Sequence, residues 1–197
     1  IKNKEKININ KLKSLIKMEV LNFFGKKKEG RELSNFWEGR VEVDGRVYGS
    51  GEGAFHGSKY IEVSNVNEGE RKSKLEKYGR KFEIDGEFGS MDGTELKKKG
   101  GKKGMMLNED EIVMWNRMGV IVQEKICKYK YDNYEVIKEV LENSRVRVLV
   151  HPAMRCNDEK VKSRWWEGRG KMIDGKIIVL GGNKLGNIWM KIRDVVV

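Results

Sequence analysis

The sequence predicts an α+β fold in a single domain, with about five helices packed against short antiparallel strands and hairpins. Three observations lead to this prediction. Apolar residues recur every three or four positions in several segments, they alternate with polar residues in others, and Asp-Gly pairs separate two pairs of alternating segments. The length of 197 residues, of which 38% are hydrophobic, suits one domain.

The first half of the chain combines strands with two helices. Residues 1–17 are a basic, lysine-rich tail, and the domain itself is expected over 18–197. Three valines alternate around Asp44-Gly45, which predicts a hairpin with a two-residue turn. An insertion around 81–104 is rich in Lys and Gly and predicts a surface loop or small hairpin. The other predicted elements are a strand at 18–24, a helix from Glu52 to Tyr60 and a charged helix at 68–78.

The second half contains the strongest helical pattern, at 109–131. Apolar residues recur there at steps of three or four, and acidic residues stand at its start. The residues expected to face inward are Ile112, Trp115, Met118, Val122 and Ile126. The later predicted elements are a helix at 134–143, a strand at 146–150, a polar loop at 151–163, a hairpin at 171–180 that turns at Asp174-Gly175, and a last helix at 187–194.

The chain is strongly basic, with 41 Lys and Arg residues against 30 Asp and Glu residues and a net charge of +11. This balance favours an anionic partner, either a phosphate-bearing small molecule or a nucleic acid. A lysine-rich composition also arises without any functional reason, so charge alone does not choose between these partners.

Cys127 and Cys156 are the two cysteines, and we expect both to be free thiols in a reducing, cytoplasmic compartment. Together with His56 and His151 they could in principle bind zinc, but their spacing does not support a metal site. We also expect no membrane association, because the sequence has neither an apolar run of transmembrane length nor an apolar signal-peptide core near its start.

Glu52 is the first candidate functional residue, because it follows the turn Gly49-Ser50-Gly51 at the predicted start of a helix. Free backbone N–H groups at a helix start favour an ionised carboxylate. Phe55 and Lys59 would lie one and two turns further on, on the same side. Taken alone, the pattern is more often that of an acid that only stabilises its helix.

Two later loops have residue types that suit a nucleotide-like ligand. Trp165 and Trp166 precede Glu167 and Arg169 in a glycine-containing loop, and indole rings stack on flat heterocycles. One of the two could equally be a core residue. The segment 181–186 is rich in glycine and contains Lys184, so it could hold a phosphate at a helix start, or it could be a plain turn.

Four motifs in this order resemble the NADAR (YbiA-like) family of N-glycosidases, over about residues 33–194. The likeness is to the family's opening Phe-Ser-Asn-Phe, its glutamate helix, its Trp-led helix and its closing Asn-containing loop. Three positions depart from the family pattern: His56 stands for Gln, Glu167 for Gly, and His151 for Glu. The matching segments are Leu33 to Phe36, Gly51 to Tyr60, Trp115 to Tyr131, and Trp165-Trp166 with Asp174-Gly175 and Gly182 to Gly186.

The resemblance implies hydrolysis of the N-glycosidic bond of a phosphorylated or ADP-linked ribose, without a metal or other cofactor. The family's substrates are riboflavin-pathway phosphoribosylamine intermediates and ADP-ribosylated guanine. Glu52 would face the sugar C1, where it could stabilise the developing cation or take a proton from water. The implied catalytic residues are Glu52, Trp115, Trp166 and either Glu167 or Asp174, and the implied substrate-binding residues are Asn35, Phe36, Lys59, Arg169, Asn183 and Lys184.

Two other classes of function remain open from the sequence. The chain could be a nucleic-acid-binding protein without activity, using the lysines at 97–99 and 102–103, although no recognised nucleic-acid-binding motif is present. It could also be an inactive ADP-ribose-binding module. The expected partners are therefore a nucleotide-like small molecule or ADP-ribosylated nucleic acid, and the sequence does not specify the oligomeric state.

Overall fold

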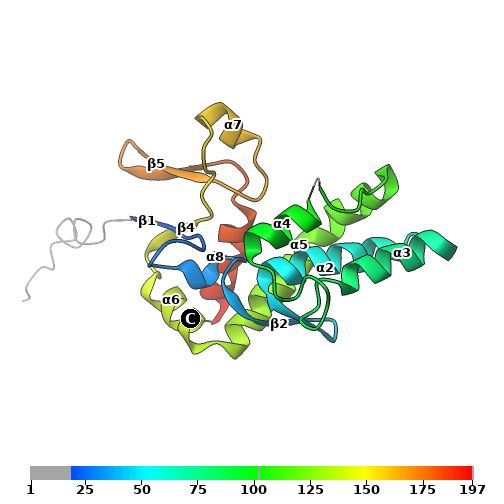
Figure 1. Cartoon of the computed structure of the whole chain (residues 1–197). Helices are drawn as coiled ribbons and strands as arrows, with labels where there is room; N and C mark the ends of the chain where they lie inside the picture. Colours follow the sequence, from blue (N-terminus) through cyan, green and yellow to red (C-terminus); the bar gives the residue numbers. More distant parts are fainter. Residues whose placement is uncertain (1–18, 102, 197) are drawn as a thin grey trace, which may run out of the picture.

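The structure is a computed structural model, and it describes residues 19–101 and 103–196. The predicted basic tail at 1–17 lies outside the described residues. Within the described ranges the fold is α+β, as predicted, with seven α-helices, one short 3-10 helix and six strands (Figure 1). The elements are β1 (Glu19–Asn22), η1 (Arg31–Leu33), β2 (Glu38–Val43), β3 (Arg46–Ser50), α2 (Gly51–Ser64), α3 (Gly69–Arg80), α4 (Gly93–Gly100), α5 (Glu109–Asn133), α6 (Glu135–Asn143), β4 (Arg147–Val150), α7 (Asp158–Lys162), β5 (Arg169–Ile173), β6 (Lys176–Leu180) and α8 (Lys184–Val196).

The strands form three two-stranded sheets. The two predicted hairpins are present as β2–β3 and β5–β6, both antiparallel. Each turns on an Asp-Gly pair in which both residues have positive φ, at 49° and 76° for Asp44-Gly45 and at 48° and 73° for Asp174-Gly175. Asp and Gly tolerate this conformation, which matches the twist of a hairpin. The third pair, β1 with β4, is parallel. Parallel strands need a long connection, and here the helices α2 to α6 lie between the two strands in the sequence and return the chain to the end of the sheet where β1 begins.

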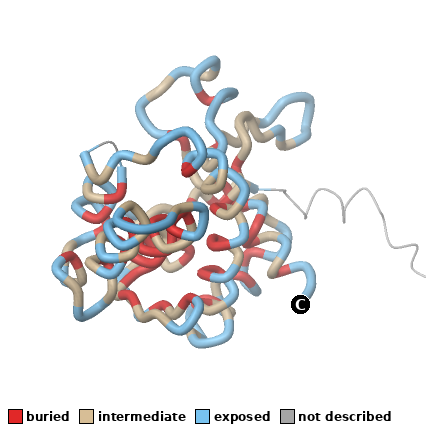
Figure 2. The backbone as a smooth tube through the Cα atoms, turned by 90° about the vertical axis from the view of Figure 1, so that its right-hand side faces the viewer, coloured by how far each residue is buried: buried red, intermediate tan, exposed pale blue. Residues whose placement is uncertain are grey.

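Two hydrophobic clusters form the core, and α5 contributes to both. In the first, α2, α3 and α4 pack with the β2–β3 hairpin, and α5 adds Val122 and Ile126. In the second, β1, β4, α6 and α8 pack together, and α5 adds Cys127. With 25 residues, α5 is about 37 Å long, enough to connect the clusters. Figure 2 shows the buried stretches in the interior and the exposed ones in the surrounding loops.

The helical pattern of 109–131 is confirmed as α5, but its inward face is narrower than the sequence suggests. Val122 and Ile126 are fully buried, whereas Ile112 is 46% exposed. Ile112 lies in the first turn of the helix, which Asn108 caps together with Glu111. Glu111 is fully buried, so at this end of the helix Ile112 faces solvent while the neighbouring acid faces inward.

The prediction of a loop or hairpin at 81–104 was wrong for residues 93–100, which form a helix. After several tight turns the segment forms α4, which Asp92 caps by accepting hydrogen bonds from Thr94 N and Glu95 N at 2.7 and 2.9 Å. Leu96 is 3% exposed and anchors the helix in the first cluster. A capping box and one buried leucine thus outweigh the unfavourable glycines at both ends of the helix.

Candidate active site

A cleft made of two adjoining hollows lies over the start of α2. The hollows measure about 390 and 380 Å³. Because they share part of their lining, they are two arms of one cleft, and Glu52 lies where the arms meet. The shared lining residues are Asn35, Glu52, Lys97, His151, Glu167 and Leu185; the first arm adds the aromatic residues Phe55, Trp165 and Trp166, and the second adds Phe24, Phe36 and the cations Lys26 and Arg155.

Glu52 is held at the first turn of α2. Ser50 is the N-cap of the helix, and its Oγ accepts a hydrogen bond from Gly53 N at 3.2 Å. The backbone N–H of Glu52 donates to Asn35 O at 2.8 Å, so this donor is satisfied from another part of the chain. The Glu52 residue is 7% exposed, so its carboxylate is largely withdrawn from solvent at the start of the helix.

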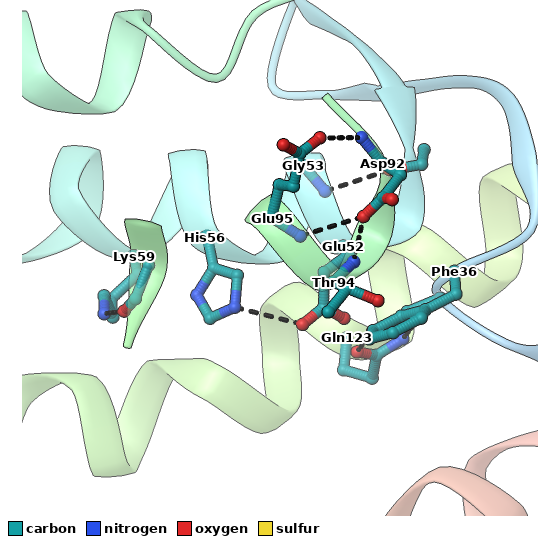
Figure 3. A network of polar contacts seen from close by, with 12 residues as sticks. Phe36, Glu52, Gly53, His56, Lys59, Asp92, Thr94, Glu95 and Gln123 are labelled. Atoms are coloured by element: carbon teal, nitrogen blue, oxygen red, sulfur yellow. Dashed lines mark hydrogen bonds and ion pairs between the residues drawn. The ribbon is translucent and has the colours of Figure 1, made fainter. Parts of the chain in front are cut away.

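His56 is the immediate neighbour of the Glu52 carboxylate. It lies one turn further along α2, and its Nε2 is 3.1 Å from Oε1 of Glu52 (Figure 3). Its ring packs against the end of α4, where a Cβ added to Gly100 would lie 2.0 Å from His56 Cγ. Only glycine fits there. The imidazole is therefore fixed in place and orients one oxygen of Glu52.

An amide pair stands beside this acid and histidine. Asn35 Nδ2 donates to Gln123 Oε1 at 2.8 Å, and Gln123 Nε2 donates to Asn35 Oδ1 at 3.0 Å. Gln123 comes from α5 and also contacts Cys127 Sγ at 3.4 Å. Both amides line the first arm of the cleft. The reciprocal bonds hold Asn35 against α5. The backbone oxygen of Asn35 in turn accepts the hydrogen bond from Glu52 N, so α5 also fixes the position of Glu52.

The aromatic wall of the first arm is built on Phe55. Its ring lies edge-on to Trp115 and Trp166, with centroid distances of 4.9 and 5.3 Å. Gly119 on α5 lies close to both indoles: a Cβ there would be tight against Trp115, at 3.3 Å, and in ordinary contact with Trp166, at 3.6 Å. Trp165 also lines this arm and is 57% exposed.

Asn183 ties the end of β4 to the loop that carries Trp166 and Glu167. Its Oδ1 accepts from His151 N at 3.0 Å, and its Nδ2 donates to Leu149 O at 2.9 Å. Its backbone N–H donates to Glu167 O at 3.0 Å. The residue is 1% exposed and has a φ of 45°, a conformation that Asn adopts more readily than most residues. Asn183 thus positions residues of the cleft from behind it.

We expect Asn183→Ala to lower the free energy of unfolding by about 2 to 3 kcal/mol, because a buried donor and a buried acceptor lose their partner. Chemical denaturation measures this. The matched control is Asn187→Ala in α8, the helix that begins directly after Asn183, where an exposed amide donates to Gly182 O at 3.1 Å and the expected change is within about 0.5 kcal/mol. Equal changes in the two variants would contradict the positioning role.

Five of the predicted site residues line the cleft. Two more, Trp115 and Lys184, contact aromatic side chains of the lining. Of the two acids proposed after Trp166, Glu167 lies in both arms, whereas Asp174 lies in the exposed turn between β5 and β6. The residues in the lining are Asn35, Phe36, Glu52, Trp166 and Glu167. Trp115 supports Phe55, and Lys184 lies with its Nζ 4.5 Å from the centroid of the Trp165 ring.

Four predicted site residues lie outside the lining of the cleft and make other contacts. Lys59 is buried and donates to Gly100 O, and burial lowers its pKa to about 8. Arg169 is held by Asp158 at 2.8 Å and by Cys156 O at 2.7 Å. Asn183 is used as described above, and Asp174 forms the hairpin turn. The resemblance implied a catalytic or substrate-binding role for each of them, but their polar groups have other partners or lie in an exposed turn.

The glycine-rich segment at 181–186 is a turn that packs against the neighbouring loop. Its backbone N–H groups at 182, 183 and 184 donate to the carbonyl oxygens of Arg164, Glu167 and Trp165. These donors already have partners and are not available to a phosphate group. Of the two alternatives, the geometry therefore supports the plain turn.

Several residues of the lining were not among the predicted site residues, and those next to Glu52 in the first arm include His56, Lys97, Gln123 and His151. His56 could have been found from the sequence, because it lies four residues after Glu52 on one helix. The other three come from α4, α5 and the end of β4. No local pattern relates them to Glu52, since only the packing of these elements brings them together.

Some negative findings concern only the described ranges, 19–101 and 103–196. In them, no cluster of three or more His, Cys, Asp or Glu residues could hold a metal ion. No helix among them has both the length and the apolar character needed to cross a bilayer. Both cysteines are free thiols, as predicted, and burial raises the pKa of Cys127 to about 12.

The chain is similar in fold to a protein of known structure. No family model matches it, and no curated protein is significantly similar to it in sequence. The solved structure of the E. coli protein YbiA superposes with a TM-score of 0.57 and 16% sequence identity, covering 91% of this chain and 86% of YbiA. At this identity the likeness shows a YbiA-like fold, and it extends over nearly the whole of both chains.

Proposed function

We propose that the chain is an N-glycosidase that hydrolyses the N-glycosidic bond of a phosphorylated or ADP-linked ribose. The observation that carries the proposal is the placement of Glu52, a buried carboxylate at a helix start, in one cleft with the indole of Trp166. Breaking such a bond develops positive charge at the sugar C1 and ring oxygen, and a carboxylate beside that centre stabilises it. The YbiA-like fold and the motif resemblance support the same reaction class.

The two arms of the cleft suit the two ends of such a substrate. The first arm offers indole and phenyl rings for the leaving base, and the second offers the cations Lys26 and Arg155 for phosphate. Lys97 lines both arms and therefore stands where the sugar and its 5′-phosphate would meet. The volume of each arm is in the range of small-molecule sites.

The test is release of sugar from two substrate classes, a riboflavin-pathway phosphoribosylamine and DNA carrying ADP-ribosylated guanosine. We expect release from at least one of them, detected by chromatography of the products. The comparison also decides between a free metabolite and a modified nucleic acid. Release from neither substrate by folded protein would refute the proposed activity.

The second candidate function is a non-catalytic module that binds nucleic acid or ADP-ribose. The observation that favours it is the basic helix α4, where Lys97 reaches the cleft and Lys98 and Lys99 follow. Binding to plain DNA or RNA that weakens steeply with salt, together with no turnover, would support the nucleic-acid module. Tight binding of ADP-ribose without turnover would support the ADP-ribose module.

A further inference from the structure

His151 lies in the middle of the cleft, but the chemistry proposed so far assigns it no role. It follows β4 directly and lines both arms, as Glu52 does. The resemblance offers no role for it, since the family has a glutamate at the matching position. Its Nδ1 is buried and has no hydrogen-bond partner in the part of the chain that the structure describes. Buried polar atoms without partners are rare and call for an explanation, and His56 Nδ1 in the same cleft is a second such atom.

The backbone of His151 is fixed by two hydrogen bonds, and its imidazole packs on a neighbouring ring. Its backbone N–H donates to Asn183 Oδ1 at 3.0 Å, and its carbonyl oxygen accepts from Gly168 N at 2.8 Å. Its ring stacks on Phe23, with centroids 5.7 Å apart and planes at 22°. Such restraint is what a group that transfers protons requires, because proton transfer depends on geometry first.

The surroundings of His151 favour the neutral imidazole. Burial is the largest effect and lowers the pKa below its usual 6.5, and the charge of Lys97 acts in the same direction. The carboxylates of Glu167 and Glu52, with the backbone of Trp166, act in the opposite direction without outweighing burial. A neutral imidazole near pH 7 carries a free lone pair, and a neighbouring carboxylate stabilises the imidazolium that forms when it accepts a proton.

Glu52 is less suited to accept that proton. One of its oxygens lies 3.1 Å from His56 Nε2, and this contact fixes the orientation of the carboxylate. A carboxylate held in this way is suited to stand opposite a cation. The two tasks that the resemblance assigns to Glu52 alone can therefore be divided between two residues of the cleft.

We propose that His151 is the general base of this cleft, which takes a proton from the attacking water while Glu52 faces the sugar cation; the proposal rests on the proposed glycosidase function. The oxygen of water forms a bond to the sugar C1, and the C1–N bond breaks with its electron pair going to the base nitrogen. The water proton passes to His151 and then to solvent, and the departing base takes a proton from solvent. No oxidant or reductant is needed.

The test is rescue of His151→Ala by azide, an anion that attacks carbon without first losing a proton. On whichever of the two substrates the wild type cleaves, we expect the variant to lose about 10²- to 10⁴-fold in kcat, with a smaller change in KM. Added azide should raise its rate in proportion to concentration and yield the glycosyl azide. The acid limb of the wild-type pH profile, set by protonation of His151, should be absent from the rescued reaction.

His56→Ala is the matched control, a histidine of the same cleft that we assign to positioning Glu52. It should lose activity without rescue by azide. His151→Gln keeps the side chain's size, so it tests the same role if the alanine variant is unstable in thermal melts. The His151→Gln variant should show the same loss in kcat, and its pH–rate profile should lack the acid limb.

The outcomes separate the two proposals. A wild type without activity on either substrate refutes the glycosidase function itself. An active wild type together with unchanged activity in His151→Ala, or with a loss that azide does not relieve and no glycosyl azide, overturns the role of His151 and leaves the glycosidase function standing.

Discussion

Glu52→Gln is expected to reduce turnover by about 10² to 10⁴-fold while the protein still binds its substrate. The substitution removes the negative charge but keeps the size of the side chain and its place at the start of α2. The charge matters most when the sugar becomes cationic, so the loss falls on kcat and KM changes little. Single-turnover assays of sugar release, with calorimetric binding of the substrate, measure the two quantities separately.

Glu62→Gln is the control for this experiment. It removes a carboxylate from the same helix, ten residues further on and outside the residues that line the cleft. It should leave turnover unchanged. A Glu52→Gln protein that cleaves substrate at the wild-type rate would exclude the carboxylate from the chemistry. A wild type that binds ligand without cleaving it would favour the binding-module alternative.

Lys130→Ala is expected to cause the largest loss of stability, about 3 to 5 kcal/mol in the free energy of unfolding. Lys130 is fully buried on α5, and its Nζ donates to Glu32 O at 2.6 Å and to Ser34 O at 3.0 Å. Removing it leaves two buried carbonyl groups without a donor and opens a cavity beside Trp189, whose ring centroid is 5.7 Å from the ammonium. Denaturant titration measures the loss.

Lys128→Ala is the matched control, because Lys128 lies two residues away on α5 and forms an exposed ion pair with Asp132 at 2.6 Å. Such surface pairs contribute about 0 to 1 kcal/mol. The same experiment bears on the site, since Lys130 holds the carbonyl of Ser34, the residue before Asn35. A Lys130 variant as stable as the Lys128 variant would contradict this account of the core.

The pH dependence of stability gives an independent check on Lys130. Burial lowers its pKa from 10.5 to about 8. Between these two values the unfolded chain binds more protons than the folded chain, so the contribution of Lys130 to stability rises with pH across that interval. The difference in unfolding free energy between the wild type and Lys130→Met should therefore grow from pH 8 to pH 10.5. A constant difference would mean that the buried amine does not titrate in this way.

Several features of the molecule depend on residues close together in the sequence, and these could be predicted. Both hairpins follow from an Asp-Gly pair between alternating residues, and the helix after Ser50 follows from its cap. The capping box at Asp92 and Glu95 was also present in the sequence, but the glycine- and lysine-rich composition around it favoured a loop. That misprediction arose because composition is an average, whereas a cap and one buried leucine act at particular positions.

The sequence by itself thus determined the fold class, the hairpin turns, the long helix α5 and the position of Glu52 at a helix start, because each depends on interactions within a few residues. Only the tertiary structure decided which side chains share the cleft with Glu52. His151, Gln123 and Glu167 come from separate elements, and their approach depends on how α5, β4 and the Trp166 loop pack. For the same reason Lys59 and Asn183, which the sequence offered as ligands, became interior anchors: their hydrogen-bond partners lie 41 and 34 residues away in the chain.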